Sequence, residues 1–258
     1  MWKLALGEVY PDAYESVVIR AEREDGEQVV LRVQFPGREN EHAADALRLW
    51  DGDGAVRMLD RDDERDAFLL ERCDPGTPLH DLQADEALDV VVDLLPRLWK
   101  PAGEPFRRME DEAVWWASSL PTDWERIGRP FERRLLDAAL HEIDGLTTTA
   151  PPERVLLHQD LHAGNVLRAA RRPWLVIDPK PLAGERALGL AALIRGWELG
   201  SRREDVLHRL DRLTSELGLD RDRSRRWAFA QTLAWSFGDE DDVIEHNVNV
   251  ATWLLDAD

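Results

Sequence analysis

Three oxygen-bearing side chains stand at positions that suit phosphoryl transfer. Asp160 and Asn165 lie in one polar segment, His158-Gln159-Asp160-Leu161-His162-Ala163-Gly164-Asn165, and Asp178 follows the apolar run Leu175-Val176-Ile177. Transfer of a phosphoryl group needs a carboxylate that accepts the proton of the attacking hydroxyl, together with a few oxygen ligands for Mg²⁺. We therefore predict that Asp160 is the base and that Asn165 and Asp178 hold the metal ion.

The same segment admits a second chemistry. His158, Asp160 and His162 offer nitrogen and oxygen ligands to a transition metal, as in a metallohydrolase. That interpretation predicts stoichiometric zinc or manganese in the purified protein, and it leaves Asn165 and Asp178 without a role. A loop histidine such as His162 also commonly makes a structural hydrogen bond.

The composition narrows the kinds of protein to which the chain belongs. Its 258 residues carry a formal net charge of −19, which repels nucleic-acid phosphates and attracts cations, although salt adaptation also produces an acidic surface. Cys73 is the only cysteine, so an intrachain disulfide and a paired-cysteine metal site are excluded. No apolar run is long enough for a membrane helix, and the N-terminus lacks a full signal-peptide layout. We expect a cytoplasmic protein, monomeric or dimeric, that binds neither membrane nor nucleic acid.

The beginning of the sequence is typical of a small antiparallel sheet. Runs rich in branched residues flank Glu24-Asp25-Gly26-Glu27, which predicts a hairpin. A helical pattern then ends at the acidic turn Asp51-Gly52-Asp53-Gly54. The expected elements are strands at 16–21, 28–35, 55–59 and 67–72, and a helix at 38–50.

The rest of the chain is mainly helical, with short strands around the polar segment. Helices are expected at 85–99, 111–118, 130–143 and from 186 to the end, and strands at 154–157, 165–168 and 174–177. The sequence therefore predicts an α+β fold of two lobes, a small antiparallel sheet lobe with one helix and a larger, mainly helical lobe. The predicted divisions are 1–72 for the N-terminal nucleotide-binding lobe, 73–78 for the hinge and 79–258 for the catalytic and substrate-binding lobe.

These segments resemble a known family. The segment 158–165, with Ile177-Asp178-Pro179-Lys180-Pro181, is similar to the catalytic and metal loops of aminoglycoside phosphotransferases, which are protein-kinase-like enzymes. The Asp-Pro-Lys-Pro run and residues 41–56 resemble the streptomycin 6-phosphotransferase branch, also called aminoglycoside/hydroxyurea resistance kinases. The resemblance implies a kinase that moves the γ-phosphoryl group of ATP or GTP, with Mg²⁺, to a hydroxyl of an aminoglycoside such as streptomycin, and so confers antibiotic resistance.

The resemblance also implies roles for single residues. His158 would brace the catalytic loop, and the backbone at Glu71 and Cys73 would meet the nucleobase. Arg32 would pair with nucleotide phosphates, with Glu41, or alternatively Glu39, as its acidic partner. The implied site residues are Asp160 and His158 in catalysis, Asn165 and Asp178 at the metal, and Arg32, Glu41, Glu71 and Cys73 at the nucleotide.

Three departures from the family's pattern motivate an alternative. Arg32 stands where the family has a phosphate-pairing lysine, the loop over the phosphates, Gly7–Ser16, holds one glycine, and Gly189 replaces an aspartate that normally ties down the catalytic loop. The alternative is a nucleotide-binding pseudokinase or regulatory module with weak or no transfer activity. Nucleotide would stabilise such a module without phosphorylation of any acceptor.

A cationic acceptor calls for carboxylates near the reacting hydroxyl. Glu198 and the acidic run that begins at Asp239 are the candidates, with His162 as a further contact. Acidic runs are also common at solvated helix starts, where negative charge favours the helix N-terminus. Lys180 either steers phosphate or forms a salt bridge with an acid.

Overall fold

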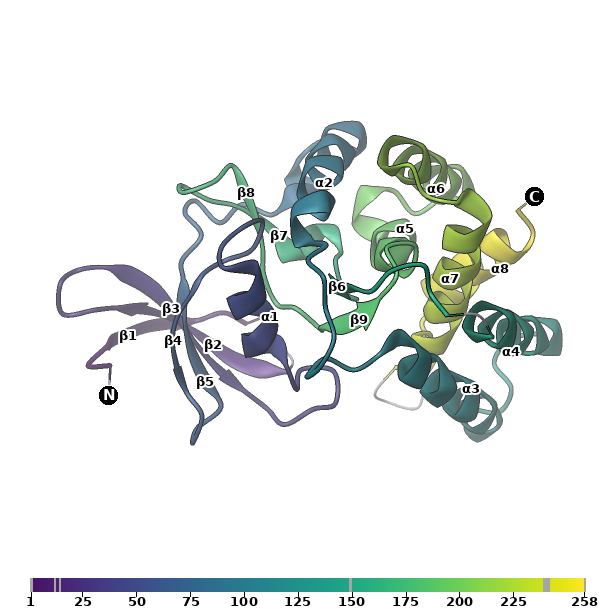
Figure 1. Ribbon diagram of the computed structural model, residues 1–258, viewed down its shortest axis with the longest axis horizontal. Helices are drawn as coiled ribbons and strands as arrows, with labels where there is room; N and C mark the ends of the chain where they lie inside the picture. The colour runs from purple at the N-terminus through teal and green to yellow at the C-terminus, as the bar shows by residue number, and fades with distance from the viewer. Residues whose placement is uncertain (1, 12, 14, 149, 239–241, 258) are drawn as a thin grey trace.

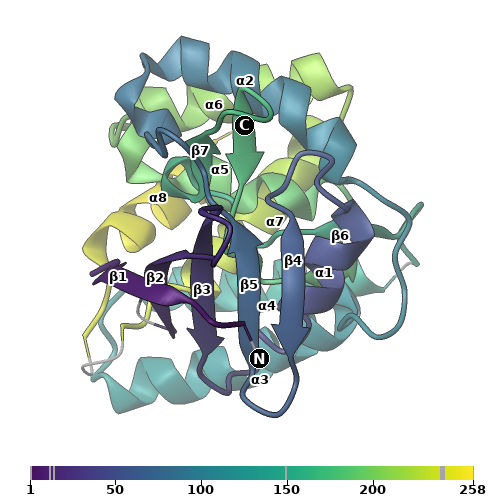
Figure 2. The same ribbon diagram turned by 90° about the vertical axis from the view of Figure 1, so that its left-hand side faces the viewer.

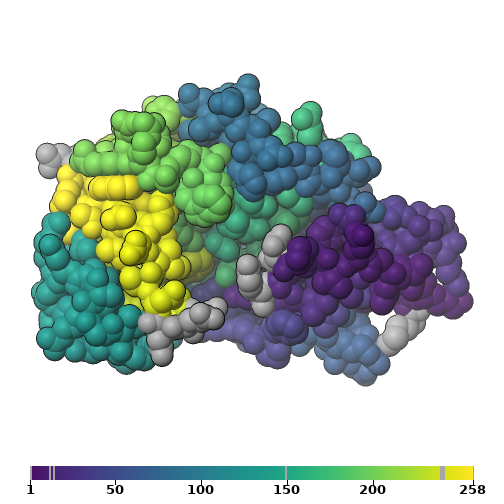
Figure 3. Space-filling model, turned by 180° about the vertical axis from the view of Figure 1, so that it is seen from behind, coloured from purple at the N-terminus to yellow at the C-terminus, as the bar shows by residue number. Residues whose placement is uncertain are grey.

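The computed structural model describes residues 2–11, 13, 15–148, 150–238 and 242–257. Its elements separate into two parts. The sheet of β1 to β5 lies at one end with α1 beside it, and helices α2 to α8 gather at the other end (Figure 1). Seen from behind, the N-terminal residues, in purple and blue, again occupy one end of an elongated molecule (Figure 3). The predicted α+β arrangement is confirmed.

The N-terminal sheet is antiparallel, with its strands in the order β1-β2-β3-β5-β4, and it faces the viewer in Figure 2. Its strands are β1 (Ala5–Val9), β2 (Ser16–Glu22), β3 (Gln28–Gln34), β4 (Met58–Asp62) and β5 (Ala67–Glu71). The predicted hairpin is confirmed as β2 and β3, whose register pairs Val17 with Val33 and Glu22 with Gln28.

Alternation along β3 decides which way its arginine faces. Side chains on a strand point to opposite sides in turn, and Val29 and Leu31 belong to a small apolar cluster on one side of the sheet. Val30 packs against the main core instead. Arg32 is two residues after Val30, so its side chain points to the same side of the sheet, toward the main core. The residue is only 3% exposed.

Helix α1 (Ala43–Trp50) is shorter than the predicted helix at 38–50. It buries Leu47 and Trp50, and the Trp50 indole donates a hydrogen bond of 2.8 Å to the carbonyl of Leu98. The strand predicted at 55–59 is also displaced. Val56 bonds to Val176 across the two parts, and the ladder with β5 begins only at Met58.

Strand β1 was not predicted, because all of its residues are exposed and give no alternating apolar pattern. Gly7 lies within this strand, beside Arg20 of β2. The loop predicted over 7–16 is therefore shorter and begins at Tyr10, whose amide donates to Val18 at 2.8 Å.

The larger part contains seven helices among its described residues, with short hairpins between them. The helices are α2 (Ala84–Leu98), α3 (Met109–Arg126), α4 (Arg133–Thr147), α5 (Ala191–Arg195), α6 (Arg203–Leu217), α7 (Arg221–Ala234) and α8 (Glu245–Leu255). The strands are β6 (Val155–Leu157), β7 (Val166–Arg168), β8 (Trp174–Val176) and β9 (Leu182–Gly184), which pair as β6-β9 and β7-β8. Single helical turns are η1 (Leu79–Asp81), η2 (Ala163–Asn165), η3 (Leu188–Leu190) and η4 (Trp197–Leu199).

Two elements of this part differ from the sequence expectation. Helix α3 is longer than the predicted 111–118, because the apolar face continues to Leu120 and Trp124. Strand β9 was not predicted, and its pairing with β6 fixes the two ends of the segment that holds the candidate site. Within the described residues, no helix has both the length and the apolar character needed to cross a membrane.

The chain leaves the sheet after Glu71 and reaches η1 through residues 72–78. In this connection the amide of Gly76 donates to Arg168 at 3.0 Å, and the amide of Arg168 donates to Thr77 at 2.8 Å. The connection is thus attached to β7 of the larger part. The division at 73–78 stays a prediction.

Candidate active site

The catalytic loop, residues 158–165, follows a strand that is entirely buried. β6 ends at Leu157, and three backbone hydrogen bonds then fold the loop on itself: Asp160 to His158 at 2.7 Å, His162 to Asp160 at 3.0 Å, and Asn165 to His162 at 3.0 Å. Such tight turns fix the direction of the intervening side chains. The loop therefore presents its polar groups from a rigid base.

Asn165 is fastened to the backbone of Asp160. Its Nδ2 donates a 2.9 Å hydrogen bond to the Asp160 carbonyl, which can only accept. The side-chain nitrogen is thereby assigned to the loop, and the side-chain oxygen of Asn165 is left for another ligand. The amide also braces the residue that carries the predicted base.

Asp178 follows β8 with a positive φ of 54°, a conformation uncommon for a residue other than glycine. Its Oδ1 lies 2.5 Å from Nη2 of Arg32. The contact is an ion pair without hydrogen-bond geometry, and both atoms are buried with no hydrogen-bond partner among the described residues. A carboxylate oxygen that here faces a single cation, Arg32, fits a metal ligand.

The carboxylate of Asp160 lies between two cations. Arg195 Nη2 is 3.4 Å from Oδ1, and Lys180 Nζ is 3.8 Å from Oδ2. Burial raises the pKa of this carboxyl, but the charges of Arg195 and Lys180 outweigh burial, and the net pKa is below the ordinary value. Asp160 is consequently ionised at neutral pH, as a base must be.

Lys180 joins the loop to the sheet side of the molecule. Besides Asp160, its ammonium lies 3.0 Å from Glu39 and 3.3 Å from Glu15. Burial lowers the pKa of Lys180, but the carboxylates of Asp160, Glu39 and Glu15 raise it above the ordinary value of a lysine. The lysine is therefore charged.

His158 is buried and holds the loop to the segment of Asp178. Its Nε2 donates to the carbonyl of Ile177 at 2.7 Å, and its ring stacks on Trp50 with 6.1 Å between centroids. Burial keeps the pKa of His158 below the ordinary value, although the hydrogen bond to Ile177 opposes that shift. A neutral imidazole in this place serves as a strut rather than as a proton carrier.

His162 and Glu198, two predicted acceptor contacts, meet at one point. His162 Nδ1 lies 2.6 Å from Glu198 Oε1 and 3.2 Å from the amide of Gly164. One nitrogen cannot donate to the first and accept from the second, and the shorter, charged contact places the proton on Nδ1. Burial lowers the pKa of His162, but Glu198 outweighs it and raises the pKa; burial raises the pKa of Glu198, but His162 lowers it overall.

The predicted acidic partner of Arg32 is wrong in this structure. Glu41 is exposed in the turn before α1, and among the described residues the recorded ion pair of Arg32 is with Asp178. Glu39, the alternative partner, binds Lys180. The reason is position: Arg32 faces inward toward the segment after β8, and residue 41 precedes the helix on the solvent side.

The predicted nucleobase contacts lie at the end of β5, where part of the backbone is already engaged. The amide of Glu71 donates to Arg57 at 2.9 Å, so it is not free for a base. Cys73 follows the strand, and burial raises the pKa of its thiol to about 12. The carboxylate of Glu71 is bound by Arg171 through contacts of 2.7 and 2.9 Å. The contacts of the Glu71 and Cys73 backbone with the nucleobase stay predictions.

Asp239 and Gly189 were also singled out from the sequence. Asp239 lies outside the described residues. Gly189 lies against the strand before the catalytic loop, and a Cβ built there would be 3.1 Å from Leu157 Cδ2. The loop is held by the hydrogen bonds of His158 to Ile177 and of Asn165 to Asp160.

Arg195, Gln231 and Trp235 were missed by sequence reasoning. Arg195 donates to Gln231 at 3.0 Å and lies 4.5 Å from the centre of the Trp235 ring. The one available signal was that Arg195 is a charged residue at the end of the apolar run 187–194. Such a signal gives no indication that the side chain reaches Asp160.

The metallohydrolase interpretation does not fit this geometry. The Nε2 of His158 donates a hydrogen bond to the carbonyl of Ile177, and the Nδ1 of His162 contacts Glu198, so neither nitrogen is available to a metal ion. Within the described residues, no three histidine, cysteine or acidic side chains are grouped to hold a metal ion. Two oxygen ligands, as Asn165 and Asp178 provide, suit a magnesium ion that also binds phosphates.

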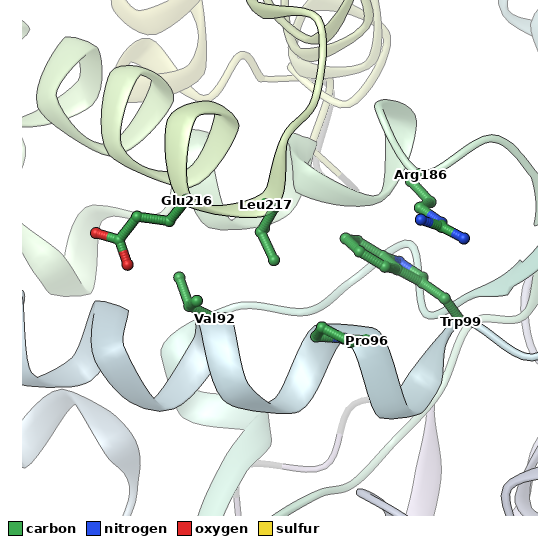
Figure 4. A pocket seen from close by; sticks show the side chains of 6 residues that line it. All are labelled: Val92, Pro96, Trp99, Arg186, Glu216 and Leu217. Atoms are coloured by element: carbon green, nitrogen blue, oxygen red, sulfur yellow. The ribbon is translucent and has the colours of Figure 1, made fainter.

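A separate hollow on the molecule contains none of the predicted site residues. It lies between α2 and the end of α6 (Figure 4). Its lining residues are Val92, Pro96, Trp99, Arg186, Glu216 and Leu217. The candidate site is therefore defined by its charged side chains rather than by this cavity.

Solved structures share the fold across nearly the whole chain. A choline kinase from Streptococcus pneumoniae has a TM-score of 0.68 at 16% identity, covering 98% of this chain and 94% of that one. An aminoglycoside phosphotransferase, APH(4)-Ia, in a complex with ADP and hygromycin B has a TM-score of 0.63 at 18% identity, covering 97% and 91%. The two-lobed, protein-kinase-like fold is confirmed.

Sequence relatives are closer. A streptomycin 6-kinase from Streptomyces glaucescens is 37% identical over 93% of this chain and 80% of the relative. A hydroxyurea phosphotransferase from Kitasatospora aureofaciens is 38% identical over 98% of this chain and 76% of the relative. The names of these relatives give no support to the pseudokinase alternative. The family model described as aminoglycoside/hydroxyurea antibiotic resistance kinase matches residues 1–239, and the chain belongs to this family of phosphotransferases.

Proposed function

We propose that this phosphotransferase moves the γ-phosphoryl group of ATP or GTP to a hydroxyl of a small cationic molecule, such as streptomycin, with Mg²⁺ as the metal. The observation that carries the proposal is the grouping of Asp160, Asn165 and Asp178. Asn165 is bonded to the backbone of Asp160, and His158 ties the same loop to Ile177, next to Asp178. Relatives that are named for phosphorylation of streptomycin and hydroxyurea support the reaction class.

Asn165 and Asp178 would hold the metal ion. The side-chain oxygen of Asn165 is free of the loop, and Oδ1 of Asp178 is buried against the cation of Arg32, whose place a metal ion would take. A bound Mg²⁺ supplies charge neutralisation for the phosphates and a fixed orientation of the transferred group. Two protein oxygens are sufficient, since phosphates and water complete the usual octahedron.

Asp160 accepts the proton of the attacking hydroxyl. As the acceptor oxygen bonds to phosphorus, the bond from phosphorus to the departing nucleoside diphosphate breaks, and the hydroxyl proton passes to the carboxylate. Arg195 and Lys180 keep that carboxylate ionised and aligned before the reaction. The rigid loop beneath Asp160 provides the positioning on which this class of reaction depends.

The acceptor meets the large part near Glu198. This carboxylate is mostly buried, holds His162 at 2.6 Å and follows Trp197, whose side chain is exposed. An acid and an exposed aromatic residue that follow each other in the chain suit a guanidino or amino group, which pairs with carboxylates and stacks on aromatic rings. The acidic composition of the chain agrees with a cationic acceptor.

The test is phosphorylation of streptomycin, hydroxyurea and a panel of aminoglycosides with labelled ATP or GTP and Mg²⁺. Asp160→Ala should abolish transfer while the protein remains folded by circular dichroism. Asp137→Ala is the control, because its exposed carboxylate pairs with Arg133 on α4 and lies outside the candidate site. Full turnover by Asp160→Ala would reject the proposed mechanism, and transfer to none of the acceptors by the wild-type protein would reject the proposed acceptor class.

A further inference from the structure

Lys180 is the cation placed between the two parts of the molecule at the catalytic loop. Its ammonium faces Glu15 and Glu39 from the sheet side and Asp160 from the loop, at 3.3, 3.0 and 3.8 Å. It also lies 5.4 Å from the centre of the Trp235 ring, and its side chain is only 14% exposed. One positive charge therefore faces three carboxylates.

The observed ion pairs differ from the expected pairing of Arg32 with Glu41 or Glu39. The acid before α1, Glu39, binds a lysine from the segment after β8, whereas the arginine of β3 binds Asp178. Arg32 is fixed in a buried slot by its planar guanidinium. Lys180 is a compact charge on a flexible stem, which suits a group that must follow a moving phosphate.

Glu15 and Glu39 differ in how firmly they are placed. The Glu15 side chain is 41% exposed and comes from the connection between β1 and β2, whereas that of Glu39 is 27% exposed. A phosphate group that approached the lysine would be repelled by both carboxylates. Glu15, the more exposed of the two, is the one with room to leave.

We propose that Lys180 binds the γ-phosphoryl group during transfer, that Glu39 anchors the lysine, and that Glu15 occupies the phosphate position until nucleotide enters. The inference rests on the function proposed above and assigns to Lys180 a role that the sequence left open. Lys180 forms no covalent bond. Its charge compensates the phosphoryl oxygens while the bond to the departing diphosphate breaks and the proton passes to Asp160.

The proposal predicts opposite effects of two substitutions on nucleotide affinity. Lys180→Ala should weaken binding of a non-hydrolysable ATP analogue by roughly tenfold, the equivalent of one charge-assisted contact, and should change ADP binding little. Glu15→Gln should tighten binding of the ATP analogue, because the competing carboxylate is gone. Lys180→Arg should recover part of the lost affinity. Isothermal titration calorimetry with Mg²⁺ measures these affinities for the wild-type protein and the three variants. The GTP analogue and GDP are run in parallel.

Lys100→Ala is the matched control, since Lys100 is also partly buried and lies 2.6 Å from Asp53. If Lys180 only held the structure together, Lys180→Ala would weaken the binding of the triphosphate analogue and of the diphosphate equally. Glu15→Gln would then tighten the binding of neither nucleotide. That result would overturn the inference. Failure of the wild-type protein to bind either triphosphate analogue would instead overturn the proposed function, so the two failures are distinguishable.

Discussion

The guanidinium of Arg32 lies 2.5 Å from the carboxylate of Asp178, so a cation of the sheet neutralises the acid that is proposed to hold the metal ion. A metal ion that approaches Asp178 without nucleotide must compete with a buried positive charge. The pair therefore couples metal binding to nucleotide binding, since phosphates give the guanidinium another anion to contact.

Arg32→Ala should accordingly have two effects. Without nucleotide, Mn²⁺ should bind roughly tenfold more tightly, because the competing cation is gone. Turnover should fall by roughly 10- to 100-fold, because a cation near the phosphates is lost. Electron paramagnetic resonance titration of Mn²⁺ and a coupled kinase assay measure the two. Arg20→Ala, which removes an exposed arginine of the neighbouring strand that pairs with Glu8, is the control. Unchanged Mn²⁺ affinity would show that Arg32 and the metal do not compete.

Asn165→Leu should raise the Mg²⁺ concentration needed for half-maximal turnover, since one oxygen ligand is removed. It also breaks the 2.9 Å hydrogen bond to Asp160, which should lower the free energy of unfolding by about 1 kcal/mol. Asn165→Asp keeps an oxygen but loses the donor, so its stability should fall while its Mg²⁺ requirement changes less. Asn249→Asp, exposed on α8, is the control. Equal Mg²⁺ requirements in all four proteins would contradict the assigned ligand.

The His162–Glu198 pair should make stability depend on pH. The pKa of His162 is raised above 6.5, so its contribution is complete below that pH and is lost as the pH rises through the folded-state pKa. The pKa of Glu198 is lowered below 4.5, so its contribution is present above that pH and is lost as the pH falls through the folded-state pKa.

Glu198→Gln should therefore lower the free energy of unfolding by about 1 kcal/mol near neutral pH, after allowance for solvent screening of the histidine, whose side chain is 34% exposed. The difference from wild type should shrink in alkaline solution, where His162 is neutral in both proteins. Urea unfolding at a series of pH values measures it. A difference that stayed constant across the series would mean that the contact is not ionic.

Arg171 should be a main contributor to the stability of the link between the two parts. It contacts both oxygens of Glu71 and the carbonyls of Gly52 and Ala55, at 2.7 to 3.0 Å. Arg171→Ala should cost about 2 kcal/mol, because those acceptors lose their charged donor. Arg172→Ala alters the exposed neighbour and should be nearly neutral. Thermal and urea unfolding of the two variants test the contrast, and equal midpoints would refute it.

The sequence was sufficient for those parts of the fold whose patterns are local. The hairpin of β2 and β3 was predicted from alternation around an Asp-Gly turn, and β5 was predicted from a run of apolar residues. β1 has no buried residue, and β9 is three residues long, so neither gives a periodic signal. Ala55 and Val56 were apolar for a reason that a local pattern does not reveal, since they pair with Val176 far along the chain.

The candidate site divides in the same way. Asp160, Asn165 and Asp178 were predictable because their residue types and spacing recur in one chemistry. Arg195, at the end of α5, lies 3.4 Å from Asp160 in the folded chain, and no spacing in the sequence indicates that approach. The exchange of partners between Arg32 and Lys180 depends on which side of β3 faces inward and on the path of the segment after β8.

Arg171 and Lys180 act at opposite ends of the sheet's central strands. Arg171 grips Glu71, where β5 finishes, while Lys180 reaches Glu15, next to the start of β2, at the end where β3 finishes. At the end near Glu71, Arg171 makes several directional hydrogen bonds. At the other end, charged contacts join the two parts: Lys180 with Glu15 and Glu39, and Arg38 with Glu112. Dissolved electrolyte weakens exposed ion pairs far more than directional bonds to backbone carbonyls. Raising the ionic strength should therefore weaken the contact of Lys180 with the exposed Glu15 more than the hydrogen bonds of Arg171 to the carbonyls of Gly52 and Ala55.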